Sequence, residues 1–278
     1  MGHHEGMRRV LLVAALCCVW PAGAAPQLAP QPPVVHVAAA GSLTGALTRI
    51  ADAWHAATGT DVRLRFGPAG LLRREIEAGA AVDVYVSANF THPEKLEREG
   101  RSTAPVIVTR NHLCATTLPG FDLNAANFVD RLLDPKVGIG TSTPGADPGG
   151  DYAWQMFDKV DALRPGAGAI LRAKAQQMVG SKVAPSRAPA YVVADAFSSG
   201  KVHIFIGYCS RRSVLPGTRY VRVPVPAAIA PQVDYGMAVI LHDGRAPVAA
   251  WRFALYLLSS RAQAIFAQYG FEPVAALK

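Results

Sequence analysis

Residues 34–47, VVHVAAAGSLTGAL, decide the fold of this chain. The first half is a short apolar run rich in Val and Ala, which is typical of a buried β-strand, and it stops at Gly41 and Ser42. Apolar residues at helical spacing follow at once, at Leu43, Ala46, Leu47, Ile50, Ala51 and Trp54. We therefore expect a strand that leads directly into a helix, with Ser42 as the N-cap of that helix.

A helix that starts directly after a strand is suited to bind an anion. Its first N–H groups have no partner within the helix, and the helix dipole places about half a positive charge there. Ser42 also has a simpler interpretation, in which its hydroxyl only caps the helix. Repetition of the strand, small-residue turn and helix further along the chain would favour the anion-binding interpretation.

The strand, turn and helix recur twice. Strands at 61–66 and 82–86 end in small-residue turns, the first around Ala69 and the second at Ser87-Ala88. Helices are expected after these turns, over 71–78 and around 92–99. Consecutive units of this kind predict a mostly parallel sheet with helices on its faces. The two turns and the one at Ser42 then fall at one edge, where such sheets bind ligands.

The second half of the chain repeats the pattern and predicts a second lobe. A strand at 136–140 leads through a Gly-rich turn into a helix at 152–159. The other expected elements are strands at 106–110, 113–117, 176–181, 203–209, 220–223 and 234–241, and helices at 127–133, 189–199, 246–259 and 261–269. The predicted fold class is α/β with two lobes and a ligand cleft between them. Lobe I is expected at 34–111 and 224–278, and lobe II at 112–223.

The N-terminus has the features of a signal peptide over residues 1–25. Arg8 and Arg9 precede the apolar stretch 10–20, and small residues follow up to Ala25. The apolar stretch is short for a membrane span, so we expect cleavage near Ala24 or Ala25 and export to the periplasm. A lipid anchor on Cys17 or Cys18 is an alternative, but Leu16 is larger than the residue that lipoprotein processing prefers.

Removal of the predicted signal peptide would leave two cysteines in the chain, Cys114 and Cys209. An even number of cysteines in an oxidising compartment predicts a disulfide, and two buried free thiols are the alternative. Both residues fall on strands expected in lobe II, and Cys209 adjoins Tyr208. The hypothesis is that a bridge between them fixes the strand that presents this tyrosine.

The residues argue against several classes of function. No serine lies in a G-x-S-x-G elbow, the histidines and cysteines lack metal-ligand spacing, and the Gly-rich turn before Asp151 matches no nucleotide-binding pattern. The net charge is +8, but the basic residues are scattered without interleaved aromatics, which argues against nucleic-acid binding. Hydroxyls and backbone N–H groups dominate the predicted ligand edge, and neutral donors of this kind suit a fully ionised oxyanion.

Four segments, in this order, resemble the periplasmic molybdate-binding protein family. They are AAAGSLT at 38–44, IEAGAAVDVYVSAN at 76–89, IGYC at 206–209 and AQAIFAQYGF at 262–271. The resemblance covers nearly all of the chain after the leader. It implies the type II periplasmic-binding-protein fold and the role of solute-binding component of an ABC importer, with a membrane permease as partner. It also implies molybdate or tungstate as ligand, no cofactor and no catalytic residue; we expect a monomer.

The resemblance also implies which residues bind the oxyanion. In that family hydroxyls and backbone N–H groups hold the anion without a cationic side chain. Matched to the motifs of this chain, the family's ligand positions fall at Ser42, Ala69, Ser87, Ala88, Gly149, Ala190 and Tyr208, of which Ser42 and Tyr208 supply hydroxyls and Ala69 and Ala88 supply amides. The positions at Gly149 and Ala190 are placed to within a residue or two, so that Tyr191 is an alternative to Ala190.

One departure from the family bears on the ligand. The family carries a serine in the turn after the second strand, and this chain has Ala69, which keeps the amide and loses the hydroxyl. A donor lost toward a charged ligand costs about 1–3 kcal/mol, or roughly 5–150-fold in affinity. Sulfate, phosphate or a small organic acid is therefore an alternative ligand. An exported enzyme and a ligandless sensor or interaction module are the alternatives outside this class.

Overall fold

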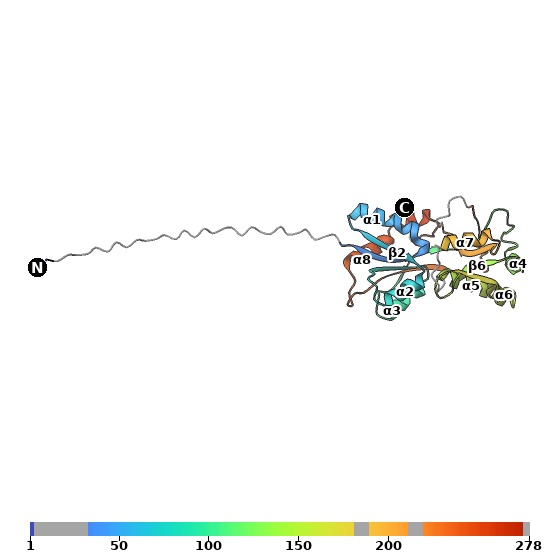
Figure 1. The fold of residues 1–278 in the computed structure, drawn as a ribbon, viewed down its shortest axis with the longest axis horizontal. Coiled ribbons are helices and arrows are strands. Elements are labelled where there is room, and N and C mark those ends of the chain that lie inside the picture. The colour runs from blue at the N-terminus through green and yellow to red at the C-terminus, as the bar shows by residue number, and fades with distance from the viewer. Residues whose placement is uncertain (3–32, 181–188, 211–218, 275–278) are drawn as a thin grey trace. The chain divides into compact units, whose positions relative to one another are not determined.

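Two five-stranded sheets form the framework of the computed structural model (Figure 1). The structure describes residues 1–2, 33–180, 189–210 and 219–274, so the predicted signal peptide lies almost entirely outside the described residues. All elements below belong to one unit, Pro32–Lys278. The first sheet has the order β2 (Val62–Gly67), β1 (Val35–Ala40), β3 (Val84–Ser87), β10 (Val233–Val239) and β4 (Val106–Asn111).

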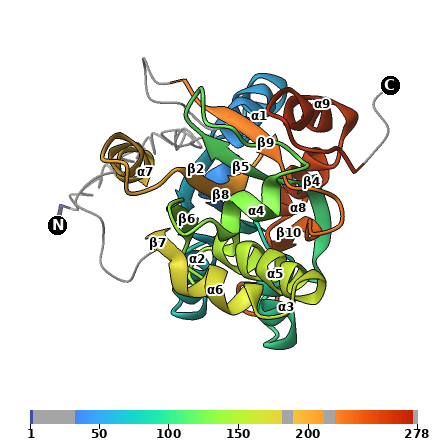
Figure 2. The same cartoon turned by 90° about the vertical axis from the view of Figure 1, so that its right-hand side faces the viewer.

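The second sheet is built from the middle of the chain. Its order is β7 (Ala175–Val179), β6 (Ile139–Ser142), β8 (Ile204–Tyr208), β5 (Leu113–Thr117) and β9 (Val221–Pro224). In Figure 2 the five strands of this sheet lie next to one another in that order. The chain passes from the first sheet to the second between β4 and β5, and it returns between β9 and β10. The expected limits of the two lobes stay a prediction.

The sheets are mixed, which corrects the expectation of mostly parallel strands. In the first sheet β1 runs parallel to β2 and β3, whereas β10 runs antiparallel to β3 and β4. In the second sheet β6 runs parallel to β7 and β8, whereas β5 runs antiparallel to β8 and β9. Strand–helix–strand units produce the parallel pairs, and the strands next to the two crossings between the sheets produce the antiparallel ones.

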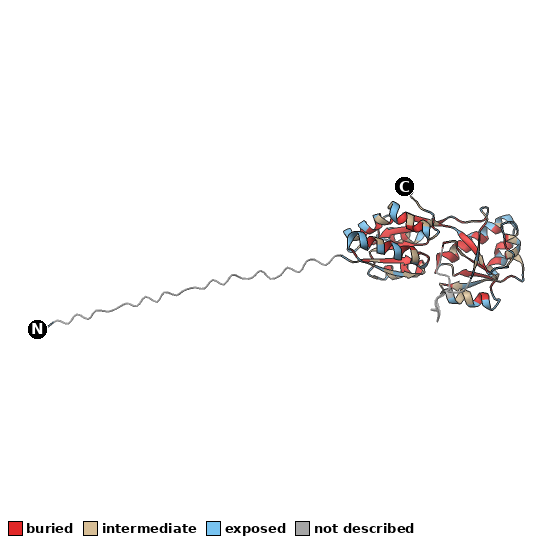
Figure 3. Ribbon diagram, turned by 90° about the horizontal axis from the view of Figure 1, so that it is seen from above, coloured by how far each residue is buried: buried red, intermediate tan, exposed pale blue. Residues whose placement is uncertain are grey.

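The apolar run of β1 is explained by helices on both faces of the first sheet. Val37 and Ala39 belong to one hydrophobic cluster and Ala38 to another, as expected where alternate residues of a strand point to opposite faces. The first cluster is covered by α1 (Thr44–Thr58), α8 (Val248–Leu257) and α9 (Ser260–Gln268), and the second by α2 (Ala69–Glu77) and α3 (Thr91–Arg98). Figure 3 shows the buried strands between these helices.

Four helices accompany the second sheet in the described part of the chain. They are α4 (Phe128–Leu133), α5 (Pro148–Leu163), α6 (Ala167–Lys174) and α7 (Pro189–Ser198). Helix α6 was not expected from the sequence. Gly166 and Gly168 disfavour a helix there, and only Ala167 and Leu171 give it a buried i,i+4 pair. Within the described ranges no helix has the length and apolarity needed to cross a membrane.

Ser42 is not a helix cap, contrary to the prediction. A short 3₁₀ turn, η1 (Gly41–Leu43), separates β1 from α1, and the residue that precedes α1 is Leu43. The 3₁₀ turn moves the start of the α-helix two residues beyond Ser42. The hydroxyl of Ser42 therefore bonds elsewhere, and this contact defines the candidate site.

Candidate functional site

The turns after β1, β2 and β3 lie at the same edge of the first sheet. β1 is the parallel neighbour of both other strands, with Ala40 opposite Gly67 and Ala39 opposite Val86. The strands therefore end side by side, and the residues that follow them share one edge. The structure in this way brings Ser42, Ala69, Ser87 and Ala88 to the edge at which the sequence analysis expects a ligand.

The hydroxyl of Ser42 is hydrogen-bonded to a buried tyrosine. Ser42 Oγ lies 2.8 Å from the hydroxyl of Tyr235 on β10, and Asn111 Nδ2 donates to the same tyrosine oxygen over 3.2 Å. Tyr235 is fully buried, and Ser42 and Asn111 are buried as well. The sequence analysis did not identify Tyr235 or Asn111, because their strands are distant from Ser42 along the chain and no local pattern links them.

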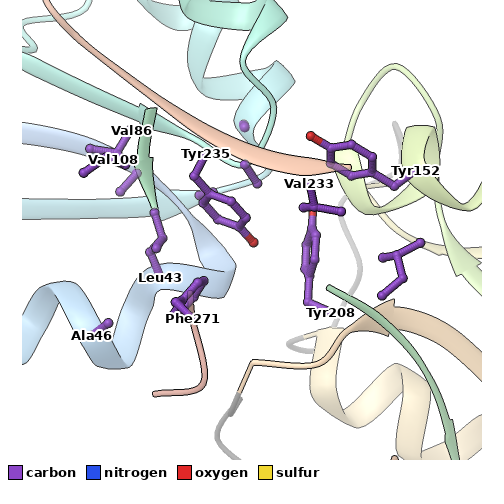
Figure 4. Close-up of a cluster of buried hydrophobic side chains, with 14 of the residues drawn as sticks. Leu43, Ala46, Val86, Val108, Tyr152, Tyr208, Val233, Tyr235 and Phe271 are labelled. Atoms are coloured by element: carbon purple, nitrogen blue, oxygen red, sulfur yellow. The ribbon is translucent and has the colours of Figure 1, made fainter. Parts of the chain in front are cut away.

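Tyr208 lies next to this group at the end of β8. Its ring packs edge-on against the rings of Tyr235, with centroids 5.8 Å apart, and of Tyr152, with centroids 6.4 Å apart. Figure 4 shows Tyr208 between these two tyrosines, with the Tyr235 hydroxyl pointing to the side of Tyr208. Tyr235 therefore joins Ser42 of the first sheet to Tyr208 of the second.

Ala69 is the first residue of α2 and is buried. Its carbonyl oxygen accepts a hydrogen bond from Tyr85 over 2.7 Å, which holds the start of the helix on β3. As the first residue of the helix, it has an amide that points out of the N-terminus without an acceptor inside the helix. This geometry suits the predicted role of Ala69 as an amide donor.

The next residue, Gly70, packs against the turn before α5. A Cβ atom at Gly70 would lie 2.9 Å from the carbonyl oxygen of Gly145 and 3.2 Å from that of Ala146. The same position is 3.5 Å from His92 Nε2. The start of α2 is therefore in direct contact with the Gly-rich turn of the second sheet, and only glycine fits there.

Gly149 stands at the start of α5, as expected, but its amide is engaged. Asp147 caps α5, and its Oδ1 accepts the N–H of Gly149 over 2.9 Å. Asp147 was not expected as a cap from the sequence, although Asp followed by Pro is a common start of a helix. A buried carboxylate is therefore an acceptor within the Gly-rich turn, for which only donors were expected.

The remaining predicted residues take different positions. Ser87 Oγ accepts the N–H of Asn89 over 3.1 Å, so its hydroxyl oxygen stabilises the turn after β3. Ala88 is part of the main hydrophobic cluster. Ala190 lies in the first turn of α7, which contacts β7. The role of each of these residues in binding stays a prediction.

Cys114 and Cys209 form a disulfide, in agreement with the sequence analysis. Their Cα atoms are 5.0 Å apart, and β5 and β8 are antiparallel neighbours that place Leu113 opposite Tyr208. The bond therefore ties β5 to the residue that directly follows Tyr208. This position fits the hypothesis that the bridge supports the strand of the tyrosine.

Burial controls the ionisation of three groups around the site. Burial, together with the positive charges of the nearby Arg73 and Arg74, lowers the pKa of His92 to about 4. It raises the pKa of the Tyr152 hydroxyl and also that of the Asp151 carboxyl, although the N–H of Gly145 offsets part of the second effect. At neutral pH His92 and Tyr152 are therefore uncharged. In the parts of the chain that the structure describes, no group of three or more His, Cys, Asp or Glu residues could hold a metal ion.

Known proteins similar to this chain include molybdate-binding relatives. The chain is 33% identical over 183 residues to the uncharacterized protein PM1146 of Pasteurella multocida. This alignment covers 65% of this chain and 76% of PM1146. It is also 27% identical over 250 residues to the molybdate-binding protein ModA of Escherichia coli. This second alignment covers 85% of this chain and 88% of ModA.

Solved structures share the fold. The periplasmic molybdate-binding protein of Azotobacter vinelandii aligns with a TM-score of 0.66 at 19% identity, over 85% of this chain and 98% of that one. The sulfate-binding protein SubI of Mycobacterium tuberculosis aligns with a TM-score of 0.70 at 19% identity, over 87% of each chain. The fold is therefore the two-lobed one of periplasmic binding proteins.

The match to a family model extends over nearly the whole described chain. Residues 35–272 fit the model described as bacterial extracellular solute-binding protein, so it includes both sheets and every strand from β1 to β10. The chain belongs to the bacterial extracellular solute-binding protein family.

Proposed function

We propose that this protein captures a small oxyanion, with molybdate as the first candidate and tungstate as its close analogue, and delivers it to the permease of an ABC importer. The observation that carries the proposal is the buried contact between Ser42 Oγ and Tyr235, with Tyr208 of the second sheet packed beside it. The hydroxyl of Ser42 and the ring of Tyr208 from the second sheet therefore both contact Tyr235. The similarity to ModA supports molybdate among the possible anions.

The donors in this arrangement are uncharged. A dianion removed from water needs a hydrogen bond for most of its lone pairs, and hydroxyls and helix-start amides supply such bonds with fixed geometry. A fixed geometry also permits selection by size, because sulfate has shorter bonds than molybdate and leaves the same donors too far from its oxygens. Solute-binding proteins of this family act outside the cytoplasm, and the proposed signal peptide accounts for export.

A second candidate ligand is an oxyanion that carries a proton, such as monohydrogen phosphate or a phosphate ester. The observation that favours it is Asp147, whose carboxylate lies in the Gly-rich turn in contact with the start of α2. An ionised carboxylate can only accept hydrogen bonds. A protonated oxyanion can donate to it, whereas molybdate and sulfate carry no proton at neutral pH. The loss of the family hydroxyl at Ala69 points in the same direction.

Titration calorimetry tests both candidates on the protein that begins after the predicted cleavage site. Molybdate, tungstate, sulfate and phosphate are titrated separately at neutral pH and constant ionic strength. Saturable heat with molybdate and tungstate and none with sulfate is the expected result. Saturable heat with phosphate alone would identify the second candidate, and no heat with any of the four anions would refute the oxyanion proposal. Ser42→Ala should weaken whichever anion binds.

A further inference from the structure

We infer that Tyr235 and Asn111 orient the hydroxyl hydrogen of Ser42 toward the bound anion, which makes Tyr235 a positioning residue of the site. The inference rests on the proposed function, because it concerns how Ser42 is prepared to donate to an oxyanion. It follows from counting donors and acceptors in the group that contains Ser42, Tyr235, Asn111 and Ser210. Each of these four residues is buried.

The side-chain amide of Asn111 has a defined orientation. Its Oδ1 accepts the backbone N–H of His112 over 2.9 Å and that of Ser210 over 3.3 Å. Backbone N–H groups can only donate, so the atom that faces them must be the amide oxygen. The amide nitrogen therefore points the other way, where Tyr235 Oη lies at 3.2 Å and Ser210 Oγ at 3.0 Å. Both Nδ2 hydrogens have an acceptor.

The orientation of Asn111 sets the direction of the next hydrogen bond. Tyr235 Oη accepts from Asn111 and lies 2.8 Å from Ser42 Oγ, a distance at which the phenol can donate to the serine oxygen. A phenol, with a pKa of about 10, is a stronger donor than an aliphatic hydroxyl. Ser42 Oγ therefore acts as the acceptor in this pair, and its own hydrogen is left to point elsewhere.

With Ser42 Oγ as the acceptor in this pair, the hydroxyl hydrogen of Ser42 has no other acceptor in the described part of the protein. Tyr235 is the single hydrogen-bond partner that the described residues offer to Ser42 Oγ. Ser42 lies in the turn after β1, at the edge shared with the start of α2. A donor held in one direction loses little entropy when the anion arrives, and it is aimed before the ligand binds. The hydrogen bonds from Asn111 to Tyr235 and from Tyr235 to Ser42, which we call the relay, supply this orientation.

The relay also connects the site to the second sheet. Asn111 is the last residue of β4, where the chain crosses to β5, and Ser210 follows Tyr208 and Cys209. The ring of Tyr235 is held by edge-on contacts with Tyr208 and Phe271 (Figure 4). A change in the position of the Tyr208 strand would therefore reach Ser42 through Asn111 and Tyr235.

A double-mutant cycle on the anion affinity tests the inference. Tyr235→Phe removes the phenol donor and keeps the ring, and we expect the Kd for the anion that the wild type binds to rise about tenfold. In the Ser42→Ala background, the same change should leave the Kd within about twofold, because the hydroxyl that it orients is already absent. Tyr256→Phe is the matched control: it removes another buried tyrosine hydroxyl, one without a hydrogen-bond partner in the described structure, and should leave the Kd unchanged.

A second variant keeps the test valid if Tyr235→Phe unfolds. Asn111→Asp retains the acceptor for the two backbone N–H groups and replaces the donor that faces Tyr235 with an acceptor, so the phenol turns away from Ser42. The part of the affinity loss that comes from the misdirected Ser42 hydroxyl should disappear in the Ser42→Ala background. The part that comes from repulsion between the added carboxylate and the anion would persist there. Thermal unfolding verifies that each variant folds.

The outcomes separate the inference from the proposed function. If the wild type binds an oxyanion and Tyr235→Phe binds it equally well, or if the losses from Tyr235→Phe and Ser42→Ala add, then Tyr235 does not act through Ser42. If the wild type binds no oxyanion, the proposed function fails and the inference fails with it. A loss of affinity that depends on Ser42 supports the inference.

Discussion

At the scale of single residues, the site depends on which oxygen carries which hydrogen. Ser42 and Tyr208 are the hydroxyls that the sequence motifs indicate, and the structure joins them through Tyr235. Ala69 is the position at which this chain has one donor fewer than the family that it resembles. The number and direction of donors, more than net charge, should therefore decide the ligand and its affinity.

Restoring the missing hydroxyl tests this view. If molybdate is the ligand, Ala69→Ser should tighten it by roughly 5–150-fold, because one additional hydrogen bond to a charged group contributes about 1–3 kcal/mol. Calorimetry on wild type and variant measures the change, with Ala80→Ser, at a partly exposed position in the turn after α2, as the control for an added serine. An unchanged Kd would mean that the site has been rebuilt around another anion.

At the scale of elements, the start of α2 and the turn before α5 act as one contact. Gly70 has no space for a side chain there because backbone carbonyl oxygens of the turn lie within 2.9 Å and 3.2 Å of the Cβ position. Asp147 fixes the same turn by capping α5. The two sheets therefore approach each other through backbone atoms, which cannot move aside as flexible side chains can.

A methyl group at Gly70 should separate the two elements. We expect Gly70→Ala to weaken anion binding by about tenfold or more while leaving each sheet folded, because the clash must be relieved by moving α2 away from the turn. Calorimetry gives the affinity and small-angle scattering the change in dimensions. Gly79→Ala is a poor control because Gly79 has a φ of 93°, whereas a Cβ atom at Gly41 would make only an ordinary contact, 3.9 Å from the carbonyl oxygen of Gly67. Equal affinities for wild type and Gly70→Ala would show that the contact plays no part in binding.

At the scale of the whole molecule, burial and covalent linkage hold the framework together. The main hydrophobic cluster contains residues from both sheets, and the disulfide closes a loop across a sequence separation of 95 residues. His92 is half-buried, and its Nε2 is enclosed close to the contact between α2 and the turn before α5.

The disulfide should contribute strongly to stability. In the chain-entropy model, closing a loop of this length stabilises the folded state by about 4–5 kcal/mol. We therefore expect the Cys114→Ser/Cys209→Ser variant to have a markedly lower urea midpoint than the wild type. Reductant should lower the midpoint of the wild type and leave that of the variant unchanged. A wild-type mass that does not rise by about 2 Da on reduction would show that the bond is absent in solution.

Acid should destabilise the protein through His92. Its pKa is about 4 in the folded state and about 6.5 when exposed, so between these values the unfolded state binds more protons. Stability is then greatest above pH 6.5 and decreases as the pH falls toward 4, by up to about 3 kcal/mol from this group. Urea unfolding across this range should show a smaller decrease for His92→Gln. Parallel profiles for the two proteins would mean that other groups dominate the acid sensitivity.

The sequence by itself determined the α/β class, most strands and helices, the strand ends at which Ser42, Ala69 and Ala88 lie, and the pairing of the two cysteines. It could do so because each follows from a local pattern: an apolar run, a small-residue turn, a helical spacing, an even cysteine count. Only the tertiary structure decided that the sheets are mixed, that Ser42 bonds to Tyr235 instead of capping a helix, and that Asp147 and His92 lie beside the start of α2. These contacts join residues that are far apart along the chain, and their geometry depends on how the strands cross between the sheets, which no local pattern records.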